Sequence, residues 1–303
     1  MFLVVLLYAI LASTFTIAKI ALSYSQPFFI IGFRMTLAGI LMMLYLYFFN
    51  NKRFLLKKED IGLFLMASVF HVYLAFIPEF WALQFLSSSK VNLIYSATPF
   101  IAALLSYFLL SEKLGFKKFA GMMIGLFGLA PIFMTQSGVR EALMEFASIS
   151  IPEVVLLGAV TSAAYAWFIV KKLLNKGYSL LMINGFAMFI GGLGAFVTSF
   201  FSLERNKVLI KDFWPFLFWT LLLILVANIV VYNFYGWLIK HFSITFVTSA
   251  GFLCPIFGAF YGWFFLNEKI TWHYFLSFVF VACGLYLFYK EEIKKRQKRN
   301  RII

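Results

Sequence analysis

The chain has 303 residues, of which 63% are hydrophobic and only 13% are charged, and its mean hydropathy is +0.92. A soluble domain is about half apolar and about a quarter charged, so this composition excludes an ordinary soluble protein. The net charge of +14 does not indicate nucleic-acid binding, because the excess Lys and Arg lie in short segments between apolar stretches and in the last fourteen residues. We therefore predict an all-α polytopic membrane protein.

Ten apolar stretches are long enough to cross a bilayer, whose core of about 30 Å needs about 20 residues per helix. Several connections between them are only a few residues long, so neighbouring helices are expected to be antiparallel. The first stretch is longer than a signal-peptide core and counts as a helix. The predicted spans are residues 2–22, 27–49, 61–86, 91–111, 116–135, 152–174, 179–202, 213–238, 245–266 and 271–289.

The distribution of Lys and Arg predicts the orientation of these helices, because cytoplasmic loops carry the excess. With the N-terminus inside, eighteen Lys and Arg are cytoplasmic, six are outside, and Lys19 and Arg34 fall within helices. Both termini are therefore expected in the cytoplasm, and the absence of an Asn-x-Ser/Thr sequon fits a bacterial inner membrane. The basic tail, residues 290–303, is interpreted as an orientation signal; the alternative is a patch for nucleic acid or anionic lipid.

A shift of 156 residues aligns 98–129 with 254–285 without a gap, and nine of thirty-two positions are identical, including Pro99 with Pro255. Each half then has five helices, so the second half enters the membrane from the opposite side. Two inverted five-helix repeats are typical of transporters whose substrate site lies between the repeats. The expected divisions are a first repeat at 1–135, an outer linker at 136–151, a second repeat at 152–289 and the tail at 290–303.

Ionisable residues inside a membrane usually face a cavity or a partner. The candidates are Lys19, Arg34, His71 and Glu79, and the rise per residue places Lys19, Arg34 and Glu79 in the outer half and His71 near the midplane. Glu79 is either an anionic anchor for a cationic substrate or a proton site, or it only neutralises Arg34 or Lys19 in a charge network. His71 is either a neutral hydrogen-bonding partner, or a proton relay or substrate contact.

Polar-tipped aromatic and amide side chains beside these charges are candidates for a cavity lining, and Trp81 and Trp167 are among the aromatic candidates. Asn228, Tyr232 and Tyr235 have the i, i+4, i+7 spacing that places residues on one helix face. Their rings suit a planar group such as adenine, and π faces attract a sulfonium. The expected substrate-binding residues are Glu79, His71, Tyr73, Asn92, Tyr95, Ser96, Tyr165, Asn228, Tyr232, Tyr235 and Tyr261.

Three prolines within the predicted spans, Pro78, Pro99 and Pro255, are expected to shape their helices, because proline frees a backbone carbonyl and can bend a helix. Such bends can widen a cavity, and the alternative is helix shaping without a functional role. Cys254 and Cys283 both lie in apolar runs, so neither a disulfide framework nor a metal site is indicated. No cofactor is expected.

A set of residues spread over the chain carries a family pattern: Pro27 with Arg34, Trp81-Ala82-Leu83, Pro99 to Glu112-Lys113 followed by Gly121, Gly125 and Gly128, and Pro255 to Glu268-Lys269 with Gly284. With this pattern the chain resembles the EamA type of the drug/metabolite transporter superfamily over nearly its whole length. Leu11 and Ala12 depart from it, because a Trp-Gly pair is common there. The resemblance implies ten helices, cytoplasmic termini, a central cavity, and export or exchange of small organic solutes.

Within that superfamily, residues 71–85 (HVYLAFIPEFWALQF) and the surroundings of Arg34 look most like the transporters of S-adenosylmethionine and S-adenosylhomocysteine of intracellular bacteria. The resemblance implies uptake of the first in exchange for the second, by alternating access. Amino-acid or drug export is the alternative, and a membrane protein without transport activity is a remote one. We find no HExxH, GxSxG, paired carboxylates or P-loop, so an enzyme is not indicated. The expected partners are a small-molecule substrate and the bilayer, with the chain a monomer or a homodimer.

Overall fold

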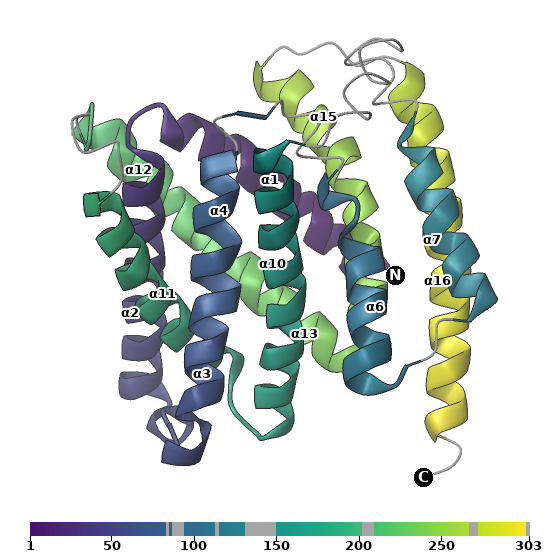
Figure 1. Cartoon of the computed structure of the whole chain (residues 1–303), viewed down its shortest axis with the longest axis horizontal. Coiled ribbons are helices and arrows are strands. Elements are labelled where there is room, and N and C mark those ends of the chain that lie inside the picture. The colour runs from purple at the N-terminus through teal and green to yellow at the C-terminus, as the bar shows by residue number, and fades with distance from the viewer. Residues whose placement is uncertain are drawn as a thin grey trace. The chain divides into compact units, whose positions relative to one another are not determined.

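The computed structural model describes residues 1–82, 85–86, 94–112, 115–130, 150–201, 209–266 and 272–300. Within these residues the chain is helical, apart from short turns and one isolated β-bridge (Figure 1). Seven of the described helices are long and apolar enough to cross a membrane. The prediction of an all-α polytopic membrane protein is therefore confirmed, while the count of ten spans stays a prediction.

The first two helical segments have the predicted bounds, whereas the helix within the predicted span 91–111 starts at Thr98 and the last helix runs to Asn300, beyond the predicted end at 289. In chain order the segments are α1 (Phe2–Leu22), α2 (Pro27–Phe49), η1 (Asn51–Arg53), η2 (Lys58–Asp60), α3 (Ile61–Ser68), η3 (Val69–Tyr73), α4 (Leu74–Ala82), α6 (Thr98–Leu110), α7 (Phe116–Gly128), α10 (Ile151–Asn175), α11 (Leu180–Phe201), α12 (Phe213–Leu223), η5 (Ile224–Val231), α13 (Tyr232–His241), α14 (Ile244–Ser249), η6 (Ala250–Leu253), α15 (Cys254–Leu266) and α16 (Trp272–Asn300). The last helix continues through the described part of the basic tail without a break at residue 290.

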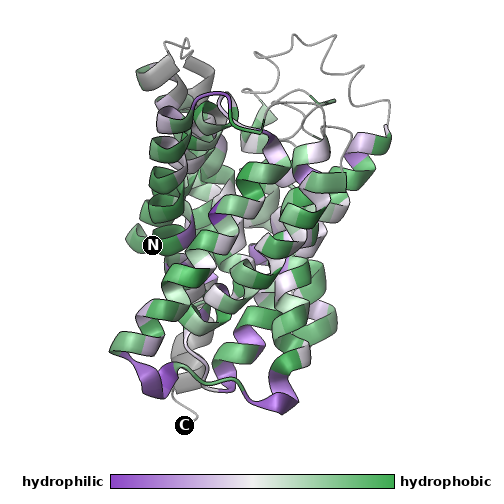
Figure 2. Ribbon diagram, turned by 90° about the vertical axis from the view of Figure 1, so that its left-hand side faces the viewer, coloured by the Kyte–Doolittle hydropathy of each residue, from purple (hydrophilic) through white to green (hydrophobic). Residues whose placement is uncertain are grey.

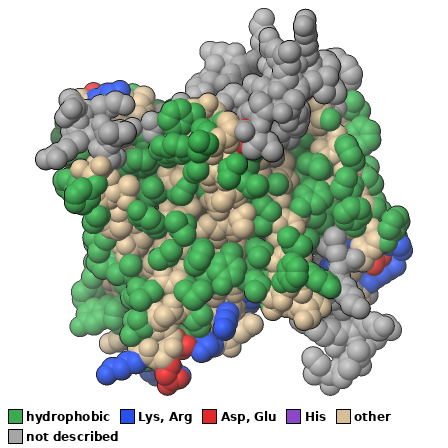
Figure 3. All heavy atoms as spheres, in the orientation of Figure 1, with side chains coloured by type: hydrophobic (Ala, Val, Ile, Leu, Met, Phe, Trp, Pro, Cys, Tyr) green, Lys and Arg blue, Asp and Glu red, His purple; other side chains and the backbone are tan. Residues whose placement is uncertain are grey.

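Large apolar side chains on the helix surfaces are exposed, as expected for helices that face lipid. Phe48, Phe201 and Trp214 are 71%, 87% and 75% exposed. Figure 2 shows apolar residues along the helices and hydrophilic residues in the turns that join them. In Figure 3, Lys, Arg, Asp and Glu side chains gather near the ends of helices, and hydrophobic side chains cover the middle of the visible face. Lipid is therefore the solvent for most of this surface.

Two of the predicted spans contain π-helical segments, which the sequence pattern does not reveal. The span that includes His71 consists of α3, the π-helical η3 and α4, and the span that includes Asn228 consists of α12, the π-helical η5 and α13. Pro78 lies inside α4, where it lacks the N–H that a regular helix needs, and the π turn comes just before it. The carbonyl of Phe70 accepts a hydrogen bond from Ser162 Oγ at 2.9 Å. These wide turns are common at functional sites.

The chain divides into two compact units. The first comprises Met1–Ser13, Leu86–Val154 and His241–Ile303, and the second comprises Thr14–Phe85 and Val155–Lys240. Each unit takes segments from both halves of the sequence, so the units are a different division from the predicted repeats, whose boundaries stay a prediction.

In the first unit, α7 and α16 cross at glycines of both helices. A Cβ added to Gly284 would lie 2.5 Å from the Gly121 carbonyl oxygen, so only glycine allows this approach. Helix α6 packs on α14, and Ser106 Oγ lies 3.0 Å from Thr245 Oγ1, at hydrogen-bonding distance. Pro99 lies in the first turn of α6, where the missing N–H costs no helical hydrogen bond, whereas Pro255 is the second residue of α15, which follows α14 and η6 directly.

In the second unit, α2 and α11 pack antiparallel along their lengths, again through glycines. A Cβ added to Gly39 would lie 2.5 Å from the backbone nitrogen of Phe189, and one added to Gly192 would lie 2.5 Å from that of Thr36. The two contacts are images of each other, because a shift of 153 residues relates both Gly39 to Gly192 and Thr36 to Phe189. The two helices therefore contact each other through equivalent positions.

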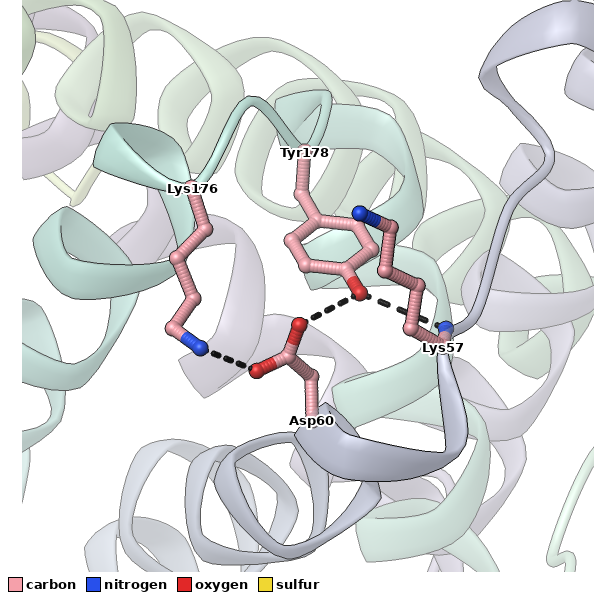
Figure 4. A network of polar contacts seen from close by, with 4 residues as sticks. All are labelled: Lys57, Asp60, Lys176 and Tyr178. Atoms are coloured by element: carbon pink, nitrogen blue, oxygen red, sulfur yellow. Dashed lines mark hydrogen bonds and ion pairs between the residues drawn. The ribbon is translucent and has the colours of Figure 1, made fainter.

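Each end of the α2–α11 pair is tied by a loop contact. At one end, buried Asp60 in η2 accepts hydrogen bonds from Lys176 Nζ at 2.5 Å and from the Tyr178 hydroxyl at 2.8 Å (Figure 4). The backbone N–H of Lys57 donates to the same hydroxyl at 3.3 Å. The Asp60 hydrogen bond raises the pKa of Lys176 above its ordinary value. This set, the Asp60 network, joins the segment after α2 to the turn before α11.

At the other end, the residues before α2 pair with the residues before α12. Ser25 and Ile210 form an antiparallel β-bridge. The Lys211 N–H donates to the Tyr24 carbonyl at 2.9 Å, and Ser25 Oγ donates to the Leu209 carbonyl at 2.8 Å. Both ends of the helix pair are thus fixed by hydrogen bonds in addition to the glycine contacts between them.

The glycine contact predicts a large effect of a single methyl group. We expect Gly39→Ala to lower the melting temperature of the purified protein, because its Cβ would meet backbone atoms of α11 that cannot rotate away. Such overpacking typically costs about 1–3 kcal/mol. The matched control is Gly62→Ala in α3, where a Cβ meets nothing within 4 Å. Equal melting temperatures for the two variants would contradict the close approach of α2 and α11.

The Asp60 network predicts a stability that depends on alkaline pH. A raised pKa means that folding binds the Lys176 proton more tightly, so this stabilisation is present below the ordinary value of 10.5 and is lost as pH rises through the raised value. We expect the melting temperature of the wild type to fall more steeply with rising pH across this alkaline range than that of Asp60→Asn. Asp212→Asn, at an exposed carboxylate of another loop, is the control and should follow wild type. Parallel profiles for all three proteins would rule the network out as a source of stability.

Candidate functional site

Arg34 lies in the interior of α2 and is only 5% exposed. Its guanidinium carbon lies 4.8 Å from the centre of the Phe76 ring of α4, within the range of a cation–π contact. The carboxylate of Glu79, also in α4 and 7% exposed, interacts electrostatically with Arg34, as does the Tyr232 hydroxyl of α13. A cation, an anion and two rings therefore share one buried region of the second unit.

His71 lies in the π turn η3 and is 3% exposed. Its ring centre is 4.5 Å from the Trp167 ring of α10 and 4.9 Å from the Tyr232 ring, and both contacts are edge-to-face. Within the described part of the chain, His71 Nε2 has no hydrogen-bond partner. An unpaired buried ring nitrogen is costly in a finished core, so a ligand or a water molecule is expected to pair with it.

Trp167 joins His71 to a second tyrosine. The Trp167 and Tyr235 rings are stacked with centres 4.1 Å apart and an interplanar angle of 18°. Trp167 also lies 6.0 Å from Tyr232. We call this set of seven side chains the arginine–aromatic cluster; its members are Arg34, His71, Phe76, Glu79, Trp167, Tyr232 and Tyr235.

The charged members of the cluster are buried, whereas the rings of Phe76, Trp167 and Tyr232 are partly exposed. Aromatic faces bind planar and cationic groups, a guanidinium binds carboxylates, and a carboxylate binds ammonium groups. The arrangement suits a small molecule that carries all of these groups, and it suits binding rather than bond making.

The three residues expected on one helix face have different partners. Asn228 Nδ2 donates to the sulfur atoms of Met35 at 2.9 Å and Met188 at 3.5 Å, whereas Tyr232 and Tyr235 pack on His71 and Trp167. The expected common face stays a prediction; Met35 and Met188, the partners of Asn228, belong to the same buried cluster on which Tyr232 packs.

Other predicted residues of the second unit lie beside the cluster with partners of their own. The Tyr73 hydroxyl lies 2.8 Å from Thr198 Oγ1, within hydrogen-bonding distance. The Tyr165 ring contacts Phe70 edge-to-face at 5.0 Å. Pro78 is two residues from Phe76 in α4, at the turn that follows the π segment.

The remaining predicted residues lie in the first unit or outside the described residues. Tyr95, Ser96 and Tyr261 belong to the first unit. Asn92 and the side chain of Lys19 lie outside the described residues. In the part of the chain that is described, no group of three or more His, Cys, Asp and Glu side chains could hold a metal ion.

Phe76 and the sulfur atoms of Met35 and Met188 were not expected at the site. A signal for the methionines does exist in the sequence. At a shift of 153 residues, IGFRMTLAGI (31–40) aligns with NGFAMFIGGL (184–193), and Met35 matches Met188 between matched glycines. The shift of 156 found in the later helices does not reveal this match, because the loops between them differ in length.

Comparison with known proteins gives one family. The model of the EamA-like transporter family matches residues 1–134 and 150–290. An S-adenosylmethionine/S-adenosylhomocysteine transporter of Chlamydia muridarum is 31% identical over 97% of this chain and 92% of its own length. The protein of the same name from Chlamydia trachomatis serovar D is also 31% identical, over 97% of this chain and 90% of its own length.

Two further likenesses are more distant. The uncharacterized transporter YoaV of Bacillus subtilis is 23% identical over 90% of this chain and 91% of its own length. One crystal structure, 13% identical in sequence, superposes with a TM-score of 0.73 and covers 96% of this chain and 96% of its own, which shows a shared fold.

Proposed function

Because the chain belongs to the EamA-like transporter family, we propose that it takes up S-adenosylmethionine in exchange for S-adenosylhomocysteine by alternating access. Family membership makes the protein a multi-pass membrane transporter of a small molecule rather than an enzyme. The observation that carries the substrate is the likeness, over nearly the full length, to two chlamydial transporters that bear these substrates in their names.

The chemistry of the arginine–aromatic cluster supports this substrate. S-adenosylmethionine has an adenine ring, a sulfonium and an α-amino acid group. The rings of Trp167, Tyr232 and Tyr235 offer faces for the adenine and the sulfonium. Glu79 is proposed as the anchor for the positive charge of the substrate, and His71 as a hydrogen-bonding partner.

Exchange also fits the cluster, because the two metabolites differ by one methyl group and one charge on sulfur. An aromatic face attracts a sulfonium through its π electrons and contacts a neutral thioether favourably as well. The same rings therefore accept both partners of the exchange. An exchange cycle also needs no coupling ion.

The proposed architecture is ten helices in two inverted repeats. Equivalent contacts of Gly39 and Gly192 support it, and so do the prolines at the starts of α6 and α15. The positive-inside pattern supports cytoplasmic termini, and the bacterial relatives support an inner membrane.

The second candidate function is export of amino acids or related compounds. The proximity of Arg34 and Glu79 favours it, because their charges complement those of any α-amino acid. It differs from the first proposal in not needing the adenine.

Reconstituted protein tests the proposal directly. We expect liposomes loaded with S-adenosylhomocysteine to take up labelled S-adenosylmethionine saturably and faster than empty ones. Glu79→Gln should lower the uptake at limiting substrate at least about tenfold, the size expected for a lost charge-assisted hydrogen bond. Glu59→Gln is the control and should leave uptake unchanged. Transport of amino acids without S-adenosylmethionine uptake would replace the first function by the second.

The aromatic part of the site has its own test. Stacking of a base on an aromatic side chain is worth about 1–3 kcal/mol. We therefore expect Trp167→Leu to weaken binding of S-adenosylhomocysteine to purified protein about 5- to 150-fold by calorimetry. Trp214→Leu, at a 75% exposed position, should bind as wild type does. Unchanged binding by a folded Trp167→Leu protein would show that the Trp167 ring is not part of the binding site.

A further inference from the structure

Arg34 carries more hydrogen-bond donors than the protein uses. The side chain is 5% exposed, and its Nε has no hydrogen-bond partner among the described residues. A guanidinium has five N–H donors in a planar fork, and leaving one unpaired in a membrane interior is costly. Phe76 covers the guanidinium from one side, and a ring face takes none of the donors in the guanidinium plane. An acceptor is therefore needed in that plane.

The packing of α2 does not need an arginine at this position. The equivalent segment of α11 keeps the matched glycines, phenylalanine and methionine but has Ala187 where α2 has Arg34. Both segments make the same close contact through Gly39 and Gly192. The scaffold residues thus recur in both helices while the arginine occurs in one, as expected of a residue kept for a ligand.

Glu79 compensates the positive charge of Arg34 but does not accept hydrogen bonds from all the N–H groups of its guanidinium. The two groups interact electrostatically within the same buried region. An α-amino acid group brings a carboxylate and an ammonium together, so it can pair with the guanidinium and with Glu79 at once. The two charges of this group cancel, so the group itself adds no net charge to the site, which lowers the cost of burying it; the additional positive charge of the sulfonium is attracted by the aromatic faces.

We propose that Arg34 is the receptor for the free carboxylate of the transported metabolite, through the in-plane N–H groups that a carboxylate binds in pairs. The inference rests on the proposed function and adds the group by which the substrate is selected. Tyr232 interacts electrostatically with Arg34, and its ring contacts those of His71 and Trp167. A ligand whose carboxylate lies at Arg34 therefore reaches the ring faces with its other end.

This placement predicts which analogues are rejected. S-adenosylmethionine and S-adenosylhomocysteine share the carboxylate, so both bind. Decarboxylated S-adenosylmethionine keeps the adenine, the sulfonium and the amine, and it lacks only the group that Arg34 binds. A transporter that recognised adenine and sulfonium alone would accept it.

The test is competition against uptake of labelled S-adenosylmethionine by reconstituted protein. For wild type, we expect decarboxylated S-adenosylmethionine to compete at least about tenfold less well than the unlabelled substrate. With the Arg34→Gln variant, the two compounds should compete about equally well, because the variant loses affinity only for the compound that carries the carboxylate. Arg34→Lys keeps the charge without the planar fork and should lie between them. Arg53→Gln, at an exposed arginine, is the control and should keep the wild-type ratio.

Equal competition by the two compounds in wild type, or an unchanged ratio in Arg34→Gln, would overturn the assignment while leaving the proposed transport intact. If Arg34→Gln does not fold, the wild-type ratio and Arg34→Lys decide. If wild type takes up no S-adenosylmethionine, the proposed substrate is wrong. Thermal shifts with methionine and its decarboxylated amine, 3-(methylthio)propylamine, then test Arg34 alone. Its role would be contradicted if the amine stabilised the protein as much as methionine does, or if neither compound stabilised it.

Discussion

The close contact between α2 and α11 at Gly39 and Gly192 is the constraint on which the second unit depends. Lipid offers helices no hydrophobic gain from association, so they associate through close packing, which small residues allow. Met35 and Met188, each beside this crossing in sequence, meet at the amide of Asn228. Because the loop ties hold both ends of the pair, Arg34 has a fixed position on α2 relative to the helices that carry the rings.

A buried charge in such a bundle is tolerable only when partners surround it. Arg34 has the Phe76 ring and the nearby carboxylate of Glu79, and His71 has two aromatic rings. The same features that make the charges tolerable support the proposed receptor, because ring faces and opposite charges are what an adenosyl amino acid complements. In the proposal, structural tolerance and substrate recognition follow from one set of contacts.

Much of the fold could be predicted from hydropathy, because the length of an apolar stretch gives the length of the membrane helix. The bounds of α1 and α2 are those expected. Charges within spans also identified Arg34, His71 and Glu79 as unusual. The π segments could not be predicted, since hydropathy does not show where a helix widens, and contacts such as that of Ser162 with Phe70 and that of Asn228 with Met35 join residues far apart in the sequence. The Asp60 network was invisible because its members are loop residues without a periodic pattern.

The most direct test of this account is an experimental structure of the protein with S-adenosylhomocysteine bound. The account predicts density for the adenosyl group against the rings of Trp167 and Tyr232, with the carboxylate of the ligand in the guanidinium plane of Arg34. Density for the ligand at a site that contacts none of these three side chains would contradict it.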